Sequence, residues 1–175
     1  MDIGCAVGRT TLELASHFDE VIGVDLSNAF IEAANNVLSS GYPDLVNKVK
    51  FIVGDACKLD QSLGKFSLIF GGNLIDRLYD PAAFLLQISQ FLESNGVLIL
   101  TSPYSWLEDF TPKDKWIGGY LKEGKPVTTQ EGLRNILGQH GFKELQAPED
   151  IRFVIKENPW VYQYTLANVT FWKKL

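Results

Sequence analysis

Short apolar runs alternate with amphipathic stretches through the first hundred residues of the chain. The apolar runs are typical of buried β-strands, and the amphipathic stretches have the spacing of helices with one buried face. The pattern predicts strands over 20–25, 49–54, 66–71 and 96–102, and helices over 8–17, 29–40 and 81–92. Because the two kinds of element alternate, we expect right-handed crossovers and a parallel sheet covered on both faces.

Capping residues support two of these helices. Ser27 or Asn28 is placed to cap the helix over 29–40, and Gly41 to close it. Asp80 is placed to cap the helix over 81–92, with Pro81 at its first position.

The last fifty residues are ordered differently. Their pattern predicts a helix over 128–139, a strand over 142–146 and a long alternating strand over 162–173. Two successive strands with no helix between them must pair antiparallel through a long loop. We therefore expect an antiparallel strand at one side of the parallel sheet.

The first strand is predicted at the very start of the chain. A central strand of a parallel sheet is normally a continuous apolar run, but only Met1 precedes Asp2. We expect one domain over 1–175 with a truncated first strand. On this expectation a leading helix and half a strand belong to a longer polypeptide.

A glycine turn follows this first strand. Asp2, Gly4 and Gly8 form the spacing D-x-G-x-x-x-G, which differs from the G-x-G-x-x-G of dinucleotide sites. Glycines allow the backbone to approach a ligand closely. An ordinary strand-to-helix turn has the same local pattern, so the turn alone does not identify a ligand site.

Two further acids end the next strands. Asp25 ends the strand over 20–25, at the distance from the turn where doubly wound folds hold a ribose. Asp55 ends the strand over 49–54 and is placed to accept from an adenine amino group. Either acid alone is also a common helix cap or turn former. With Asp2, three acids in one register favour a nucleoside site.

These residues resemble the class I S-adenosylmethionine-dependent methyltransferases. The resemblance implies a Rossmann-like, doubly wound fold with a mostly parallel seven-stranded sheet whose last strand is antiparallel. It implies that S-adenosylmethionine is the cofactor and S-adenosylhomocysteine its product. The wider class usually has a third glycine where this chain has Ala6.

The resemblance also implies positions for the cofactor. Gly4 and Gly8 would flank its methionine part, and Arg9 would meet its carboxylate. Asp25 would hold the ribose. The full set of expected cofactor-binding residues is Asp2, Gly4, Cys5, Gly8, Arg9, Asp25, Leu26, Asp55, Ala56, Cys57 and Asn73.

Two later stretches narrow the resemblance. Residues 73–81 and 102–112 look like the methyltransferase domain of ovothiol biosynthesis. That domain often follows a histidine–cysteine sulfoxide synthase and is taken to methylate an imidazole nitrogen of 4-mercaptohistidine. The chain departs from the family near Trp160, where basic residues are usual, and at Tyr164, where a histidine is usual.

Two aromatic, irregular stretches are expected to wall the substrate pocket. They are 103–120 and 150–160, and long loops in compact domains are usually functional. The alternative is that their aromatic residues only cover the edges of the sheet. Asp76 and Tyr79 are placed to orient the acceptor ring, or else to cap a helix and lie at the edge of the core. The full set of expected substrate-binding residues is Asp76, Arg77, Tyr79, Tyr104, Trp106 and Arg152.

The two arginines of that set are candidates for the carboxylate of an amino-acid substrate, because a guanidinium fork matches a carboxylate. No catalytic residue is assigned. His17 and His140 are the only histidines, and both fall at ends of predicted helices. A neighbouring thiolate makes an imidazole electron-rich, so a strong protein base is unnecessary.

Composition narrows the partners. The net charge is −5 with no run of basic residues, which argues against nucleic acid and acidic membranes. Cys5 and Cys57 have no metal-type spacing, so we expect no metal site and two reduced thiols. A small-molecule substrate and a cytoplasmic location follow as expectations.

Three functions are compatible with these sequence features. The leading one is an N-methyltransferase acting on 4-mercaptohistidine or another small molecule. The second is a non-catalytic domain that binds S-adenosylmethionine. The third is a nicotinamide oxidoreductase, which the spacing of the glycine turn disfavours.

Overall fold

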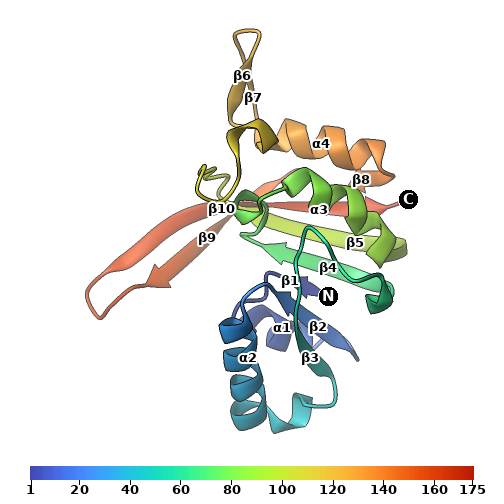
Figure 1. Ribbon diagram of the computed structural model, residues 1–175, viewed down its shortest axis with the longest axis vertical. Helices are drawn as coiled ribbons and strands as arrows, with labels where there is room; N and C mark the ends of the chain where they lie inside the picture. The colour runs from blue at the N-terminus through green and yellow to red at the C-terminus, as the bar shows by residue number, and fades with distance from the viewer.

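The computed structural model describes residues 1–175 as one α/β unit (Figure 1). Its helices are α1 Arg9–Leu14, α2 Asn28–Gly41, α3 Pro81–Ile88 and α4 Thr129–Gln139. Its strands are β1 Asp2–Ile3, β2 Val21–Asp25, β3 Val49–Val53, β4 Phe66–Gly72, β5 Leu92–Ser102, β6 Tyr120–Lys122, β7 Lys125–Val127, β8 Phe142–Glu144, β9 Glu149–Lys156 and β10 Tyr162–Lys174. None of the helices combines the length and the apolar character that crossing a membrane requires.

The strands form a sheet in the order β3-β2-β1-β4-β5-β10-β8. Strands β1 to β5 pair parallel, and β10 pairs antiparallel with β5 and with β8. This confirms the predicted Rossmann-like sheet of mostly parallel strands with an antiparallel last strand. The chain reverses its strand order between β1 and β4, which is where open α/β sheets bind ligands.

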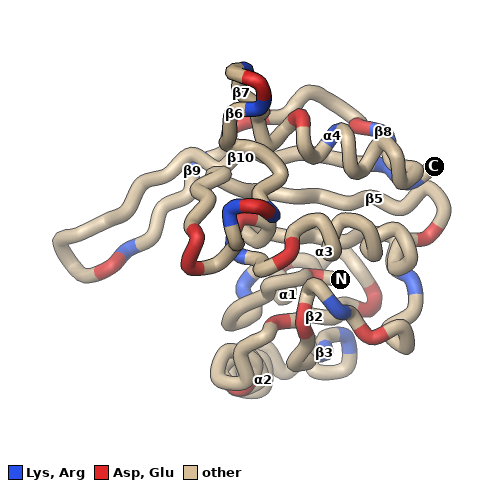
Figure 2. Tube along the Cα trace, turned by 45° about the horizontal axis from the view of Figure 1, so that its top comes forward, with Lys and Arg blue, Asp and Glu red and all other residues tan.

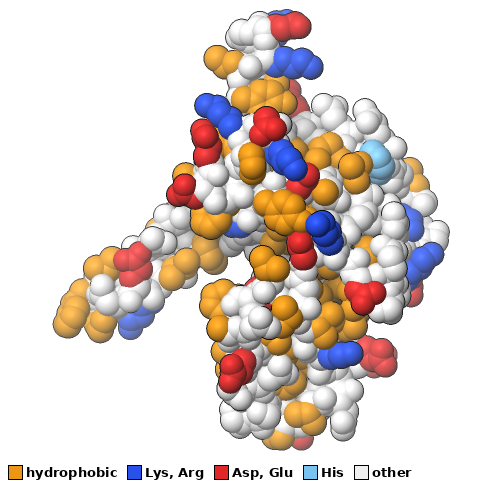
Figure 3. Space-filling view, in the orientation of Figure 1, with side chains coloured by type: hydrophobic (Ala, Val, Ile, Leu, Met, Phe, Trp, Pro, Cys, Tyr) orange, Lys and Arg blue, Asp and Glu red, His pale blue; other side chains and the backbone are white.

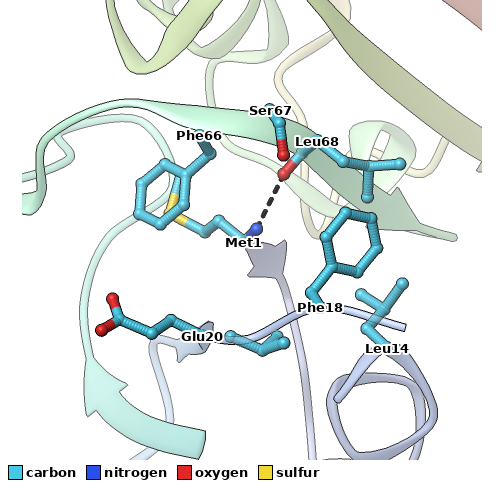
Figure 4. Close-up of a pocket in the computed structure, with 8 residues that line it drawn as sticks. Met1, Leu14, Phe18, Glu20, Phe66, Ser67 and Leu68 are labelled. Carbon is cyan, nitrogen blue, oxygen red and sulfur yellow. Dashed lines mark hydrogen bonds between the residues drawn. The ribbon is translucent and has the colours of Figure 1, made fainter. Parts of the chain in front are cut away.

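The central strand β1 is only two residues long. Asp2 lies between Gly23 of β2 and Phe70 of β4. The amino group of Met1 donates to the carbonyl oxygen of Leu68 at 2.8 Å. Figure 4 shows the small hollow of about 30 Å³ beside Met1, at the amino ends of the strands and away from the strand-ending acids.

Helices pack on both faces of the sheet. Two residues of β2 show the division, since Val21 packs with α1 and α2 while Val24 packs with α3 and α4. The α1 and α2 side holds a smaller core of nine buried residues, and the other side holds a core of 23. Strand alternation therefore places one helical layer on each face.

The predicted N-caps of α2 and α3 are present, but Gly41 is the last residue of α2 and Tyr42 takes the C-cap position predicted for it. The Ser27 hydroxyl accepts from the N–H of Phe30, and the Asp80 carboxylate accepts from the N–H of Ala83 at 3.0 Å. Thr128 and Glu131 form a capping box at the start of α4. Helix α3 ends at Ile88, earlier than predicted, because a 3₁₀ turn leads into β5.

Two hairpins were not predicted. Strands β6 and β7 form a separate exposed hairpin. Strand β9 lies where the sequence suggested a loop over 150–160, and it pairs antiparallel with β10 as an eighth strand of the large sheet. We call β9, the turn after it and residues 162–167 of β10 the arm. The arm projects from the body of the domain (Figure 1).

Candidate functional site

Two cavities lie at the carboxyl ends of the parallel strands. The first, of about 150 Å³, is lined by Gly4, Asp25, Leu26, Gly54, Asp55, Ala56, Leu74, Arg77, Leu78 and Tyr79. The second, of about 370 Å³, is lined by Gly4, Cys5, Ala6, Val7, Arg9, Thr10, Phe70, Gly72, Asn73, Thr101, Ile151 and Phe153. Gly4 lines both cavities. We call the first the acidic cavity and the second the arm-side cleft.

Asp25 is positioned by two backbone donors. Its Oδ2 accepts from the N–H of Ala6 and its Oδ1 from the N–H of Ser27, both at 2.9 Å. Each carboxylate oxygen can accept more than one hydrogen bond, so both oxygens can still accept from a ligand. Leu26 follows, is 68% exposed and lines the cavity, where it offers an apolar surface.

Asp55 is held in the same way across the acidic cavity. Its Oδ1 accepts from the N–H of Cys57 at 2.8 Å, and its Oδ2 accepts from the hydroxyl of Tyr79 at 2.9 Å. This hydrogen bond raises the pKa of Tyr79 to about 12, so the phenol stays protonated. The structure therefore places Tyr79 beside Asp55, on the opposite side of Gly4 from the arm-side cleft.

The glycine turn has two different steric requirements. Gly4 has φ of 74°, and a Cβ there would lie 2.8 Å from Cδ1 of Leu74. Gly8 has φ of 89°, and a Cβ there would lie 2.4 Å from Cζ of Phe51. Gly8 lines neither cavity, so it serves the packing of the turn against β3. Ala6 also has a positive φ of 47°, which is the left-handed region that glycine adopts more easily.

Asp2 and Cys57 line neither cavity, whereas Cys5 lines the arm-side cleft. Asp2 is buried and its Oδ2 accepts from the Thr11 hydroxyl at 2.6 Å. Burial raises the pKa of Asp2 to about 6. Burial also raises the pKa of the Cys5 thiol to about 12, so Cys5 lines the arm-side cleft as a neutral group. Cys57 is buried beside α3 and its thiol donates to the carbonyl oxygen of Asp80 at 3.3 Å.

The remaining two expected cofactor residues lie at the arm-side cleft. Asn73 has a positive φ of 50°, and its N–H donates to the carbonyl oxygen of Thr101 at 2.8 Å. Arg9 lies at the start of α1 and forms an exposed ion pair with Glu13 at 3.5 Å. An exposed pair of this kind is weak, so the guanidinium remains available to an anionic ligand.

Asp76 belongs to the framework of the domain. The structure buries it completely. Its carboxylate accepts from the hydroxyl of Ser102 at 2.9 Å and from the N–H and hydroxyl of Ser105, both at 3.0 Å. Arg77 donates to the same carboxylate at 2.9 Å and to the carbonyl oxygen of Ser105. The prediction that Asp76 orients a substrate is therefore wrong, because its acceptor sites hold the chain after β5 in place.

Arg77 has a mixed environment. Its guanidinium also lies 5.0 Å from the ring centroid of Phe110. It lines the acidic cavity and not the arm-side cleft. With its donors turned to Asp76 and Ser105, Arg77 closes one wall of that cavity.

Trp106 is a core residue. Only 8% of it is exposed, its ring stacks on Trp116 at 6.2 Å, and its N–H donates to the Thr129 hydroxyl at 2.9 Å. The prediction of a substrate wall at Trp106 is wrong, and the alternative that these aromatic residues cover the sheet is correct for it. Tyr104 lines a different hollow at the base of the β6–β7 hairpin.

The arm supplies the wall that the sequence analysis assigned to other residues. Ile151 and Phe153 of β9 line the arm-side cleft. Arg152 lies between them, and alternation turns it to the opposite face of the strand, so it does not join the cleft. The signal was present in the sequence, because Ile151, Phe153 and Ile155 alternate with other residues at a period of two.

Asn168 joins the arm to the body and was not among the predicted site residues. It lies opposite Ser102, where β10 leaves β5. Its Oδ1 accepts from the Tyr104 hydroxyl at 3.1 Å and from the amide of Gln130 at 3.0 Å. Its amide donates to the Asp150 carboxylate at 2.9 Å. Nothing local in the sequence separates this residue from any other strand asparagine.

The arm-side cleft contains no side chain suited to act as a base near neutral pH. Its lining has two ionisable groups, the thiol of Cys5 with its raised pKa and the guanidinium of Arg9. Neither His17 nor His140 lines either cavity. An acceptor bound in this cleft must therefore bring its own reactive lone pair.

Comparison with known proteins identifies the family. A family profile described as "Methyltransferase domain" matches residues 1–139. The chain belongs to this family. It has the fold of class I S-adenosylmethionine-dependent methyltransferases.

Solved structures share this methyltransferase fold over nearly all of the chain. A SAM-dependent methyltransferase from Methanosarcina mazei is 19% identical with a TM-score of 0.70, covering 99% of this chain and 91% of that one. Magnesium protoporphyrin IX methyltransferase from Synechocystis, with bound SAH, is 20% identical with a TM-score of 0.63, covering 99% and 73%.

Curated methyltransferases match over shorter stretches. Magnesium-protoporphyrin O-methyltransferase of Rhodobacter capsulatus is 42% identical over 69 residues, or 39% of this chain. Tocopherol O-methyltransferase of Arabidopsis thaliana is 31% identical over 105 residues, or 58% of this chain. The chain spans 29% of the length of each of these two relatives.

Proposed function

We propose that this domain is an S-adenosylmethionine-dependent N-methyltransferase that acts on the imidazole ring of 4-mercaptohistidine. The observation that carries the proposal is the chemistry of the arm-side cleft. Its lining is apolar or neutral apart from Arg9 and has no side chain suited to remove a proton near neutral pH. Such a cleft suits an acceptor whose nitrogen already has a free lone pair.

The residues present fit the cofactor. Asp25 would accept from the two ribose hydroxyls, Asp55 from the adenine amino group, and Leu26 would pack on the adenine ring, in keeping with their places in the acidic cavity. Gly4 and Asn73 would hold the methionine end where the two cavities meet, with Arg9 near its carboxylate. When bound, S-adenosylmethionine supplies an electrophilic methyl group on a sulfonium.

The protein would contribute position and exclusion of water to this reaction. Phe70 and Ile151 offer apolar surface to one side of an acceptor ring, and Phe153 closes the cleft from the arm. Thr101 and Asn73 offer polar atoms to orient it. In 4-mercaptohistidine the thiolate makes the ring electron-rich, and after transfer the ring proton can leave to water.

The choice of acceptor is supported by the resemblance of residues 73–81 and 102–112 to the methyltransferase domain of ovothiol biosynthesis. Under this proposal, a sulfoxide synthase, fused to the domain or separate, must precede it in the pathway. A methyltransferase for another small molecule with a neutral nucleophile fits the same cleft. A domain that binds the cofactor without turnover is a third outcome.

The deciding experiment measures transfer of labelled methyl from S-adenosylmethionine to 4-mercaptohistidine, with histidine as the acceptor that lacks the thiolate. We expect label in the mercaptohistidine ring, little in histidine, and none with Asp25→Ala. Calorimetric binding of S-adenosylhomocysteine is measured on the same preparation. Tight binding without transfer to any imidazole acceptor would contradict the proposed acceptor and favour a different substrate or a non-catalytic domain.

A further inference from the structure

The arm concentrates exposed apolar side chains. Of the 23 large hydrophobic residues that are exposed in the whole domain, nine lie within residues 151–166, with exposures from 37% to 86%. They are Ile151, Phe153, Val154, Ile155, Trp160, Val161, Tyr162, Tyr164 and Leu166. Figure 3 shows hydrophobic side chains gathered on the projecting arm. An apolar patch of this density on a projecting element is typical of an interaction surface.

The backbone of the arm is also unpartnered on one side. Strand β9 pairs with β10 and with no other strand, so its outer edge has free N–H and C=O groups. A ribbon of two strands is marginally stable in water. A long, exposed, apolar edge strand is a template for pairing with another strand.

We propose that this edge pairs with the same edge of a second copy of the chain. The two β9 strands would run antiparallel about a two-fold axis at Phe153, so that the two arms form one four-stranded sheet. A two-fold interface uses the same patch on both copies. It therefore requires β9 to be complementary to itself.

Symmetry restricts the possible registers. A two-fold axis through the sheet places like faces side by side, so odd-numbered residues of β9 must oppose odd-numbered residues. With Phe153 on the axis, Ile151 opposes Ile155 of the second copy. Asp150 then opposes Lys156 of the second copy, and the same pair recurs by symmetry. Shifting the axis to Arg152 would place the two copies of Arg152 directly opposite one another, which like charge disfavours.

One charge pair of the arm favours this register. Pairing with β10 places Glu149 and Asp150 at the base of β9 and Lys156 beside the turn, and charges of both signs lie along the arm (Figure 2). The register aligns Asp150 with Lys156 of the second copy within the strands, whereas Glu149 aligns with Glu157, the first residue after β9. The arm carries three acids and two bases, a net charge of −1 of the −5 of the whole chain, so two arms repel each other only weakly.

The second copy would also reach the arm-side cleft. Ile151 and Phe153 line that cleft, and Ile155 lies on the same face of β9. In the proposed register Ile155 of the second copy becomes the neighbour of Ile151, one strand spacing of about 4.8 Å away. Dimerisation would extend the apolar wall of each cleft with a side chain from the other copy.

The first test is sedimentation over a range of concentrations, and we expect a dimer. Lys156→Glu places two acids opposite each other at both symmetric positions, so dimerisation should weaken on the order of tenfold or more. Asp150→Lys should do the same, although it also removes a hydrogen bond to Asn168. The double variant restores opposite charges and should regain much of the lost affinity.

Lys122→Glu on the exposed β6–β7 hairpin is the matched control, since it makes the same charge change away from the arm. Circular dichroism melts confirm that each variant is folded. A wild-type monomer at every concentration would overturn the proposal. So would a dimer that Lys156→Glu weakens no more than Lys122→Glu does.

Cross-linking tests the register directly. With Phe153→Cys, two thiols face each other across the axis, and mild oxidation should give a covalent dimer. With Ile155→Cys, the two thiols lie four residues apart along the strands, about 14 Å, and should not cross-link. The native Cys5 and Cys57 are buried, so they do not compete. Cross-linking at 155 and not at 153 would overturn the register, and none of these results depends on methyl transfer.

Discussion

The two halves of the site are built from different kinds of contact. On the side of the acidic cavity, each acid lies at or just after the end of a strand and accepts one hydrogen bond from a donor two residues along the chain and one from across the site, Ala6 for Asp25 and Tyr79 for Asp55. The donors two residues along are the backbone N–H groups of Ser27 and Cys57. On the side of the arm, the contacts join segments far apart in the chain. Phe153 lines the same cleft as Gly4, and Asn168 bonds with Tyr104.

This difference separates what can be inferred from local pattern from what requires the folded structure. A strand-ending acid beside a glycine turn is recognisable in a short window of sequence. A cleft wall made by an arm that returns from residue 153 is not.

The largest expected effect concerns Trp106. Trp106→Ala should lower the free energy of unfolding by about 3–5 kcal/mol, because it removes a buried aromatic ring and its hydrogen bond to Thr129. Phe153→Ala is the matched aromatic variant on the arm. Since 37% of Phe153 is exposed, that variant should lose about 1 kcal/mol or less and should reduce methyl transfer instead.

Denaturant titration gives the stability of both variants, and initial rates give their activity. The assignment of Trp106 to the core is contradicted if Trp106→Ala is as stable as the wild type but transfers methyl groups more slowly. In that case Trp106 would be a substrate residue, as the sequence alone suggested.

The next effect concerns Asp25. Asp25→Ala removes two hydrogen bonds from ribose hydroxyls to a charged acceptor, each about 1.5–3 kcal/mol. Affinity for S-adenosylhomocysteine should therefore fall at least about 100-fold in calorimetry. Asp60→Ala is the control, because Asp60 also accepts a backbone N–H two residues on, from Ser62, but lines neither cavity. Equal losses for the two variants would contradict the ribose assignment.

The smallest effect concerns Asp2, which lies beneath the turn. Burial raises its pKa from 3.8 to about 6 in the folded state. The folded protein thus holds the proton more tightly, and this contribution to stability is present at low pH and lost as pH rises from about 4 to about 6. The loss amounts to at most about 3 kcal/mol.

Asp2→Asn should remove this part of the pH dependence, measured as the difference in unfolding free energy between variant and wild type. Thr11→Val tests the direction in which the pKa of Asp2 moves when its hydrogen bond is lost. The hydrogen bond from Thr11 lowers the pKa of Asp2, so its removal should extend the loss of stability above pH 6. Parallel pH profiles for Asp2→Asn and the wild type would contradict the assignment.

Most of the sheet and the acidic cavity could be predicted from the sequence. The pattern placed the parallel strands, the caps at Ser27 and Asp80, and the acids that face the acidic cavity. Each of these features can be recognised within a few residues, because it ends or caps an element, although Asp25 and Asp55 also bond with the distant Ala6 and Tyr79.

The substrate side could not be predicted in the same way. Asp76 also follows a strand, in the 3₁₀ turn after β4, yet its partners Ser102 and Ser105 lie 26 and 29 residues away. A carboxylate that binds framework hydroxyls looks the same in sequence as one that binds a ligand. Trp106 was misassigned for the same reason, because its partner Thr129 lies 23 residues further on.

Strand β10 has a mechanical consequence. It runs without interruption over Tyr162–Lys174, pairing with β5 in its second half and with β9 in its first. At about 3.4 Å per residue it is roughly 44 Å long. Only its second half is held in the body of the sheet, between β5 and β8. A force on the free end of the arm is therefore transmitted along β10, past Asn168, to Thr101 of β5. Thr101 lines the arm-side cleft. Movement of the free end of the arm would therefore change the position of Thr101 in the arm-side cleft of the same domain.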